Sequence, residues 1–180
     1  MEKRTLVPVQ KRSFSIDYSS NIVLLGSCFS SAMGSRLTEM KFNAFTNPFG
    51  TVFNPVSIAK LLKFEKVNPQ KIVQRDDVFF HYDYHSDVHG YSSNEIIQNI
   101  ESRNQTTKEF LKEATQVFIT LGTSWVFEYE NEVVNNCHKQ DKSLFNRRLL
   151  LLSEIEKALS EIVSSIHQIN KEIEIVFTVS

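Results

Sequence analysis

Residues 21–29 read Asn-Ile-Val-Leu-Leu-Gly-Ser-Cys-Phe, a continuous apolar run that ends at Gly26 and Ser27. A run without polar alternation is typical of a strand buried on both faces of a parallel sheet. Apolar residues then recur at helical spacing within residues 30–40. Ser27 is therefore predicted to lie where a buried strand passes into a helix.

The same order of strand and helix recurs towards the C-terminus. Residues 116–122 and 173–180 are two further apolar runs, and residues 152–169 carry Ile and Leu at spacings of three and four. Because that pattern covers fewer than three heptads, it favours a helix packed on a sheet over a coiled coil. We therefore predict an α/β fold with a doubly wound parallel sheet and flanking helices, whose site lies at the carboxyl edge of the strands.

Shorter elements are expected between these. Three helices are predicted, one after the cap Asn54, one from Ser93 and one over residues 107–114. A strand is predicted over residues 78–84 and a hairpin over residues 126–134. No linker or repeat divides the chain, so residues 1–180 are interpreted as a single domain. Since three parallel strands make a thin sheet and no helix covers the last strand, we expect the fold to continue beyond Ser180.

Composition excludes several classes of protein. Lys and Arg total 20 against 21 Asp and Glu, which leaves no basic field for nucleic acid. Two cysteines are too few for a disulfide scaffold, and no apolar window is long enough for a signal peptide or a membrane span. Phosphate-binding glycine loops and dinucleotide fingerprints are absent from the sequence. We therefore expect a cytoplasmic protein without a cofactor that binds small molecules rather than nucleic acid or membranes.

The position of Ser27 admits two roles. A serine that begins a helix is commonly its N-cap, and the same position allows it to act as a nucleophile if a base accepts its proton. The amides at the helix start would then face a developing oxyanion. Cys28 is a rival nucleophile, but we expect its side chain to point into the core.

Several segments resemble one known family. Leu-Gly-Ser-Cys-Phe-Ser at residues 25–30 is similar to the signature of the GSCFA family, with Ser30 in place of its alanine. Residues 47–55, 121–125 and 136–139 resemble further segments of that family, in the same order. The family is grouped with the SGNH-type hydrolases, so the resemblance implies an SGNH- or flavodoxin-like sheet.

The resemblance also implies roles for individual residues. Ser27 matches the nucleophile of the SGNH hydrolases, although the Asp that precedes that serine in those enzymes is absent here. Gly50 would supply an oxyanion-hole amide, unless it is simply a turn glycine. Ser124 stands where those enzymes carry an oxyanion-hole Asn, and its hydroxyl is a shorter donor. The remaining expected binding residues are Gly122, Thr123, Asn54, His85 and His138.

The leading hypothesis is an acyl or acetyl ester hydrolase that acts on a small molecule or an acylated carbohydrate. SGNH enzymes carry their Asp and His in a late block, which we expect to follow Ser180. One alternative is a binding domain that keeps the hydrolase fold without turnover. Another is a metal site, because His81, His85 and His89 would share one face if their segment were a strand.

Overall fold

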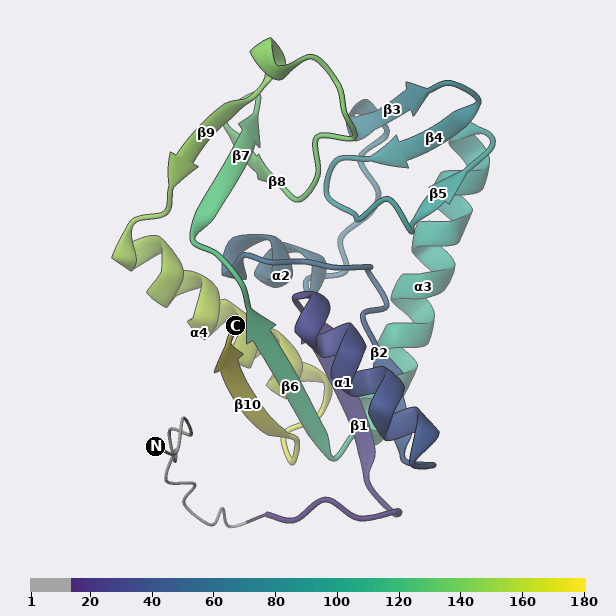
Figure 1. The fold of residues 1–180 in the computed structure, drawn as a ribbon, viewed down its shortest axis with the longest axis vertical. Coiled ribbons are helices and arrows are strands. Elements are labelled where there is room, and N and C mark those ends of the chain that lie inside the picture. Colours follow the sequence, from purple (N-terminus) through teal and green to yellow (C-terminus); the bar gives the residue numbers. More distant parts are fainter. Residues whose placement is uncertain (1–13) are drawn as a thin grey trace, which may run out of the picture.

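A four-stranded parallel sheet forms the lower half of the molecule in Figure 1. The computed structural model describes residues 14–180. Val23 pairs with Val117 and Leu25 with Ile119, and all four side chains are buried. This burial on both central strands explains their apolar sequences. In the spatial order β10-β6-β1-β2, the strands are β10 (Glu174–Val179), β6 (Gln116–Leu121), β1 (Asn21–Gly26) and β2 (Asn43–Thr46).

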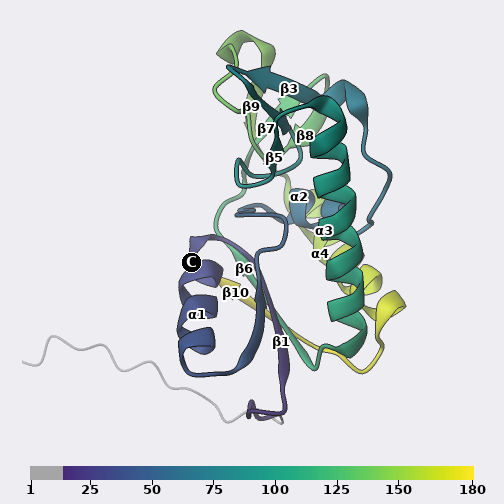
Figure 2. The ribbon, with the colours of Figure 1, turned by 90° about the vertical axis from the view of Figure 1, so that its right-hand side faces the viewer.

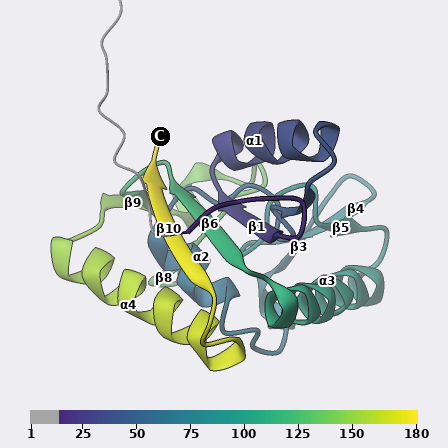
Figure 3. The same cartoon turned by 90° about the horizontal axis from the view of Figure 1, so that it is seen from below.

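Helices cover both faces of this sheet (Figures 2 and 3). One face carries α1 (Cys28–Glu39) and the other carries α3 (Ser93–Glu113) and α4 (Leu152–Ile169). The short α2 (Pro55–Leu61) packs against α4. The predicted α/β fold is thus confirmed, and α4 buries Ala158, Ile162 and Ile166 within this domain rather than in a coiled coil.

The long helix α3 corrects one expectation. Two separate helices were predicted here, one from Ser93 and one over residues 107–114, and the segment between them is polar. Two of its polar side chains are buried and bonded instead: Asn104 accepts a hydrogen bond from the Tyr84 hydroxyl (3.4 Å), and Thr107 donates one to the Arg103 carbonyl (2.6 Å). Because these groups are satisfied, one helix of 21 residues runs through.

Two small antiparallel sheets lie beyond the carboxyl ends of the parallel strands (Figure 1). Glu130 and Asn131 have φ of +50° and +64° and form the turn of the predicted hairpin, which is confirmed. The predicted strand at residues 78–84 ends already at His81. The first sheet contains β3 (Ile72–Arg75), β4 (Val78–His81) and β5 (His89–Gly90); the second contains β8 (Glu132–Val134), β7 (Trp125–Tyr129) and β9 (Asn146–Leu149).

Shorter features complete the chain. Single turns of 3-10 helix lie at Pro69–Lys71 and Lys142–Leu144.

Within residues 14–180, none of the helices has the length and apolar character that crossing a membrane requires.

Candidate functional site at the β1–α1 junction

The junction between β1 and α1 is pressed against the end of β6. Gly26 has φ of +121°, and a Cβ added to it would collide with the carbonyl oxygen of Thr120. The Ser27 amide donates a hydrogen bond to that same oxygen (2.9 Å). Only glycine combines this backbone conformation with so close an approach, so the local sequence Gly-Ser fixes the position of Ser27.

The Ser27 hydroxyl caps α1. Its Oγ accepts a hydrogen bond from the Phe29 amide (3.3 Å) and lies 3.2 Å from the Ser180 hydroxyl. Gly122 lies alongside, since a Cβ built on it would be 3.3 Å from the Ser27 Cβ. Only 1% of the Ser27 surface is exposed. The serine therefore stands at the carboxyl edge of the sheet and is covered there by neighbouring residues.

Asn47 holds this junction, and the sequence analysis missed its role. Its Oδ1 accepts a hydrogen bond from the Gly26 amide (2.9 Å), while its Nδ2 donates to the Ser31 hydroxyl (2.8 Å) and the Ser27 carbonyl (3.4 Å). Its own backbone is left-handed, with φ of +41°, a conformation that asparagine tolerates better than most residues. The available signal was an asparagine at the start of the family-like segment 47–55.

Gly50 adopts the turn conformation that the sequence analysis left open as one alternative. Its φ is +74°, and its amide donates to the Asn47 carbonyl (2.8 Å). Its α-carbon packs against the Cβ of His85, with no room for a side chain. The amide that the resemblance assigns to an oxyanion hole is thus already engaged inside the protein.

The segment after β6 is similarly engaged. The amides of Gly122 and Thr123 both donate to the Phe53 carbonyl, at 2.8 and 3.2 Å. Ser124 is half-buried, and its carbonyl accepts a hydrogen bond from the Leu150 amide (2.9 Å). The structure therefore places Gly122 beside Ser27. The amides of Gly122 and Thr123 are already hydrogen-bonded to the loop that contains Phe53.

A family model described as the GSCFA family matches residues 21–180. The chain belongs to the GSCFA family. Searches among curated proteins and among solved structures found no match. The GSCFA family is related to the SGNH-type hydrolases, and membership assigns neither a reaction nor a nucleophile to this chain.

Three other expected binding residues of this GSCFA chain differ in how deeply they are buried. Asn54 is buried and caps α2, where its Oδ1 accepts a hydrogen bond from the Ser57 amide (2.8 Å). His85 is partly exposed, and its Nδ1 lies 3.0 Å from the Asp87 carboxylate. His138 is 2% exposed. His85 is therefore the one of these three whose side chain reaches solvent.

His138 is enclosed between aromatic rings. It stacks on Phe80 with ring centroids 4.8 Å apart, and its Nε2 lies 3.0 Å from the His81 carbonyl. Because a carbonyl only accepts, Nε2 carries the proton, and Nδ1 has no hydrogen-bond partner among the described residues. Burial lowers the pKa of His138 to about 4, so the ring is neutral near pH 7.

The alternative of a metal-binding face made of His81, His85 and His89 does not agree with the structure. The strand β4 ends at His81, and the chain turns before β5 begins at His89, so the three side chains do not share one strand. The His81 ring is buried and bonded on both sides: Nε2 to the Asn68 carbonyl (3.1 Å) and Nδ1 to the Asp83 amide (3.2 Å). Within residues 14–180, no three side chains of His, Cys, Asp or Glu gather as metal ligands.

The expectation for Cys28 was also wrong, since its side chain is exposed rather than in the core. The strand ends at Gly26, so Cys28 begins the helix instead of continuing the alternation of a strand. The other cysteine, Cys137, is half-buried, and burial raises the pKa of its thiol. Cys28 is thus an accessible thiol one residue from Ser27.

Proposed function

We propose that this GSCFA chain is a serine ester hydrolase, or the part of one that carries the nucleophile, with Ser27 as that nucleophile. The observation that supports the proposal is the placement of Ser27 at the carboxyl end of a central parallel strand, at the start of α1 and beside Gly122. In doubly wound folds this edge is where ligands bind. The proposed substrate is an acyl or acetyl ester of a small molecule or a carbohydrate.

In the proposed reaction the Ser27 Oγ attacks the ester carbonyl carbon and loses its proton to a base. The tetrahedral intermediate then collapses, the carbon–oxygen bond to the alcohol breaks, and the alcohol leaves with a proton. Water hydrolyses the acyl-serine in a second, equivalent step. We propose that the base is an imidazole that has to be brought to Ser27, since no histidine within residues 14–180 forms a hydrogen bond with its Oγ.

The proposed oxyanion donors are the Ser124 hydroxyl and the Gly50 amide. Gly50 could donate only if its hydrogen bond to the Asn47 carbonyl opened, and the Ser27 amide is held in the same way by Thr120. Since one oxyanion donor contributes about 3 kcal/mol to catalysis, these engaged amides predict slow turnover until the loop that contains Gly50 moves.

A fluorophosphonate probe tests the nucleophile directly, because a reactive serine displaces its fluoride and forms a stable phosphorus–oxygen bond. We expect labelling of the chain that is abolished in Ser27→Ala. Ser30→Ala is the matched control, because Ser30 is equally buried on the same helix and its hydroxyl donates to the Leu25 carbonyl (2.8 Å). Labelling that persists unchanged in Ser27→Ala would reject Ser27 as the nucleophile.

Hydrolysis of p-nitrophenyl acetate is the second readout, and it needs one further control. The exposed Cys28 thiol can itself be acylated by this ester. The assay should therefore be run in a Cys28→Ala background, with and without Ser27→Ala. Equal rates of hydrolysis in the two proteins would contradict the proposed reaction.

A second candidate function is a ligand-binding domain that keeps the hydrolase fold without turnover. The specific observation in its favour is that Ser27 is 1% exposed while its amide and that of Gly50 are both bonded inside the protein. This candidate predicts that acyl esters or acylated sugars raise the melting temperature without being hydrolysed. Hydrolysis that depends on Ser27 would exclude it.

A further inference from the structure

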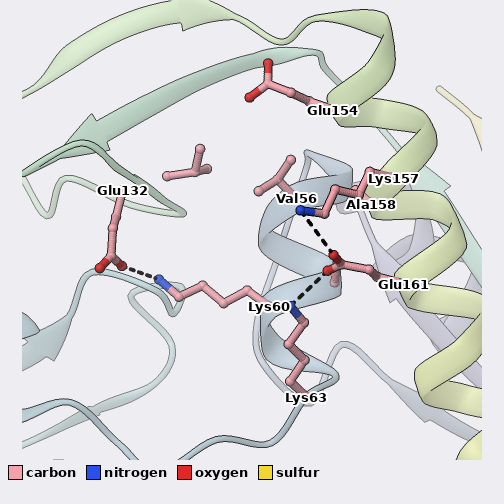
Figure 4. A pocket seen from close by; sticks show the side chains of 10 residues that line it. Val56, Lys60, Lys63, Glu132, Glu154, Lys157, Ala158 and Glu161 are labelled. Atoms are coloured by element: carbon pink, nitrogen blue, oxygen red, sulfur yellow. Dashed lines mark hydrogen bonds and ion pairs between the residues drawn. The ribbon is translucent and has the colours of Figure 1, made fainter.

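A charged cavity lies between α2, α4 and β8, and Figure 4 shows the contact there between Lys60 and Glu132. Lys60 Nζ lies 3.3 Å from Glu132 Oε2, and Lys71 Nζ contacts the same oxygen. The cavity of about 330 Å³ adjoins a second one of about 180 Å³, and Lys60 and Glu132 line both. This ion cluster is therefore reached from two sides.

Without Glu132, the cluster carries one positive charge in excess. Asp83 is 8% exposed and lies 2.8 Å from Lys60 and 3.6 Å from Lys71, which is itself 7% exposed. One buried carboxylate thus faces two ammonium groups. The balancing charge comes from Glu132, whose side chain is 60% exposed. Because Lys71 keeps Asp83 as a partner, the position of Glu132 can be taken by another carboxylate without leaving a buried charge unpaired.

The ammonium of Lys71 stays charged despite its surroundings. Burial by itself lowers the pKa of Lys71, but the hydrogen bond to Glu132 and the charges of Asp83 and Glu132 raise it overall. The same contact with Lys71 lowers the pKa of Glu132. Both members of the pair are therefore ionised near neutral pH while Glu132 is in place.

We propose that Lys60 and Lys71 form a binding site for the carboxylate of a small-molecule ligand, and that Glu132 is an internal occupant which the ligand displaces. A ligand with one negative charge leaves the cluster neutral, as Glu132 does. Val56, Ala59 and Val133 line the larger cavity and offer an apolar wall to the carbon chain of the ligand. A short aliphatic carboxylate such as butyrate matches both features.

Glu132 competes with an external carboxylate for the two lysines, and this competition determines how much its removal should change the affinity for butyrate. A tethered side chain competes at an effective concentration in the millimolar range or above, so it weakens the apparent affinity for an external carboxylate. Removing it should therefore lower the dissociation constant for butyrate by about tenfold or more. The hairpin between β7 and β8 that carries Glu132 is otherwise left intact.

The experiment is a titration of the protein with sodium butyrate at constant ionic strength, followed by amide chemical shifts. We expect saturable binding to Glu132→Ala, about tenfold or more tighter than to the unaltered chain. Adding Lys60→Met to Glu132→Ala should abolish it; Lys60 is partly exposed, so this change leaves the core intact. If circular dichroism shows that Glu132→Ala does not fold, Glu132→Gln replaces it with the same expected result.

Glu161→Ala is the matched control. Glu161 lines the same cavity and pairs with two lysines, Lys63 (2.9 Å) and Lys157 (3.9 Å), but both of these are substantially exposed. We expect no gain in butyrate binding from this change. Equal gains in the two variants, no binding to Glu132→Ala, or binding that survives Lys60→Met would each overturn the proposal. Dimethyl phosphate binding more tightly than butyrate would overturn the assignment to a carboxylate.

Discussion

At the Ser27 junction, backbone amides are held by hydrogen bonds within the protein. At the lysine cavity, the exposed side chain of Glu132 balances the charge of Lys60 and Lys71. The amides of Gly26, Ser27 and Gly50 all donate to groups within the protein at 2.8–2.9 Å. In the cavity, Lys71 and Asp83 are buried, while Glu132 reaches in from solvent. Short directional hydrogen bonds therefore fix the junction. In the cavity, the negative charge of Glu132 is one that another anion can supply.

This difference matters for how each region would work. Hydrogen bonds hold the backbone of Ser27 in one position, which suits a reaction that needs defined geometry. An exposed ion pair contributes little to stability, which suits a group that leaves when a ligand arrives. The two regions can be tested separately, because they share no side chain among those that carry either proposal.

The largest effect is expected from Gly26→Ala. The new Cβ would collide with the Thr120 carbonyl, and the backbone would be strained at φ of +121°, so we expect a loss of roughly 3 kcal/mol or more in the free energy of unfolding. Urea denaturation measures it. Gly122→Ala is the comparison: its Cβ would meet a Phe53 ring atom at 2.8 Å, and the ring can turn aside. Equal costs at the two glycines would contradict a rigid junction.

The next effect is a loss of stability on acidification that arises from two buried histidines. Burial lowers the pKa of both His81 and His138 to about 4. Between about pH 6.5 and 4 the unfolded chain therefore binds more protons than the folded one, and stability falls as the pH falls. Each histidine contributes on the order of 3 kcal/mol over this range.

Urea denaturation at several pH values checks this, with His138→Phe as the variant. The phenyl ring fills the same space next to Phe80 and does not titrate. The unfolding free energy of His138→Phe should fall less steeply between pH 6.5 and 4 than that of the unaltered protein. If the unfolding free energies of the two proteins fell in parallel with pH, His138 would have the same pKa in the folded and unfolded states.

An intermediate effect is expected from Asn47→Ala. The change leaves the Gly26 amide without its acceptor, at a cost of about 1–3 kcal/mol. Asn47→Asp keeps that acceptor and should cost less. Asn43→Ala is the matched control, because Asn43 is exposed and bonds only Asn21 through its side chain (2.6 Å). Thermal denaturation ranks the stabilities of the three variants. An equal loss of stability in all of them would contradict a specific role of Asn47 in holding the junction.

The smallest effect is expected from Glu132→Ala. Because the Glu132 side chain is 60% exposed, its ion pairs with Lys60 and Lys71 should contribute less than about 1 kcal/mol to stability. Urea denaturation measures the difference. A loss of 3 kcal/mol or more would mean that Glu132 is a structural partner of Lys71 and not a displaceable one.

Patterns along the sequence predicted the elements that depend on strong periodicity. The buried strands β1 and β6, the amphipathic α4 and the hairpin turn at Glu130 and Asn131 all follow from local rules that need no partner. The failures were elements whose residues are polar and whose bonding partners are distant. The edge strand β2 and the continuity of α3 through Asn104 belong to this group, since both depend on contacts with other segments.

By itself, the sequence determined that a strand ends at Gly26, that Ser27 lies where this strand passes into a helix and that the chain resembles the GSCFA family, because these properties lie within contiguous residues. Only the tertiary structure decided that Asn47 holds the junction, that the Gly50 amide is engaged and that Lys60, Lys71 and Glu132 meet. The physical reason is that hydrogen bonds and ion pairs act over a few ångströms in space, and folding sets those distances between residues far apart in the chain.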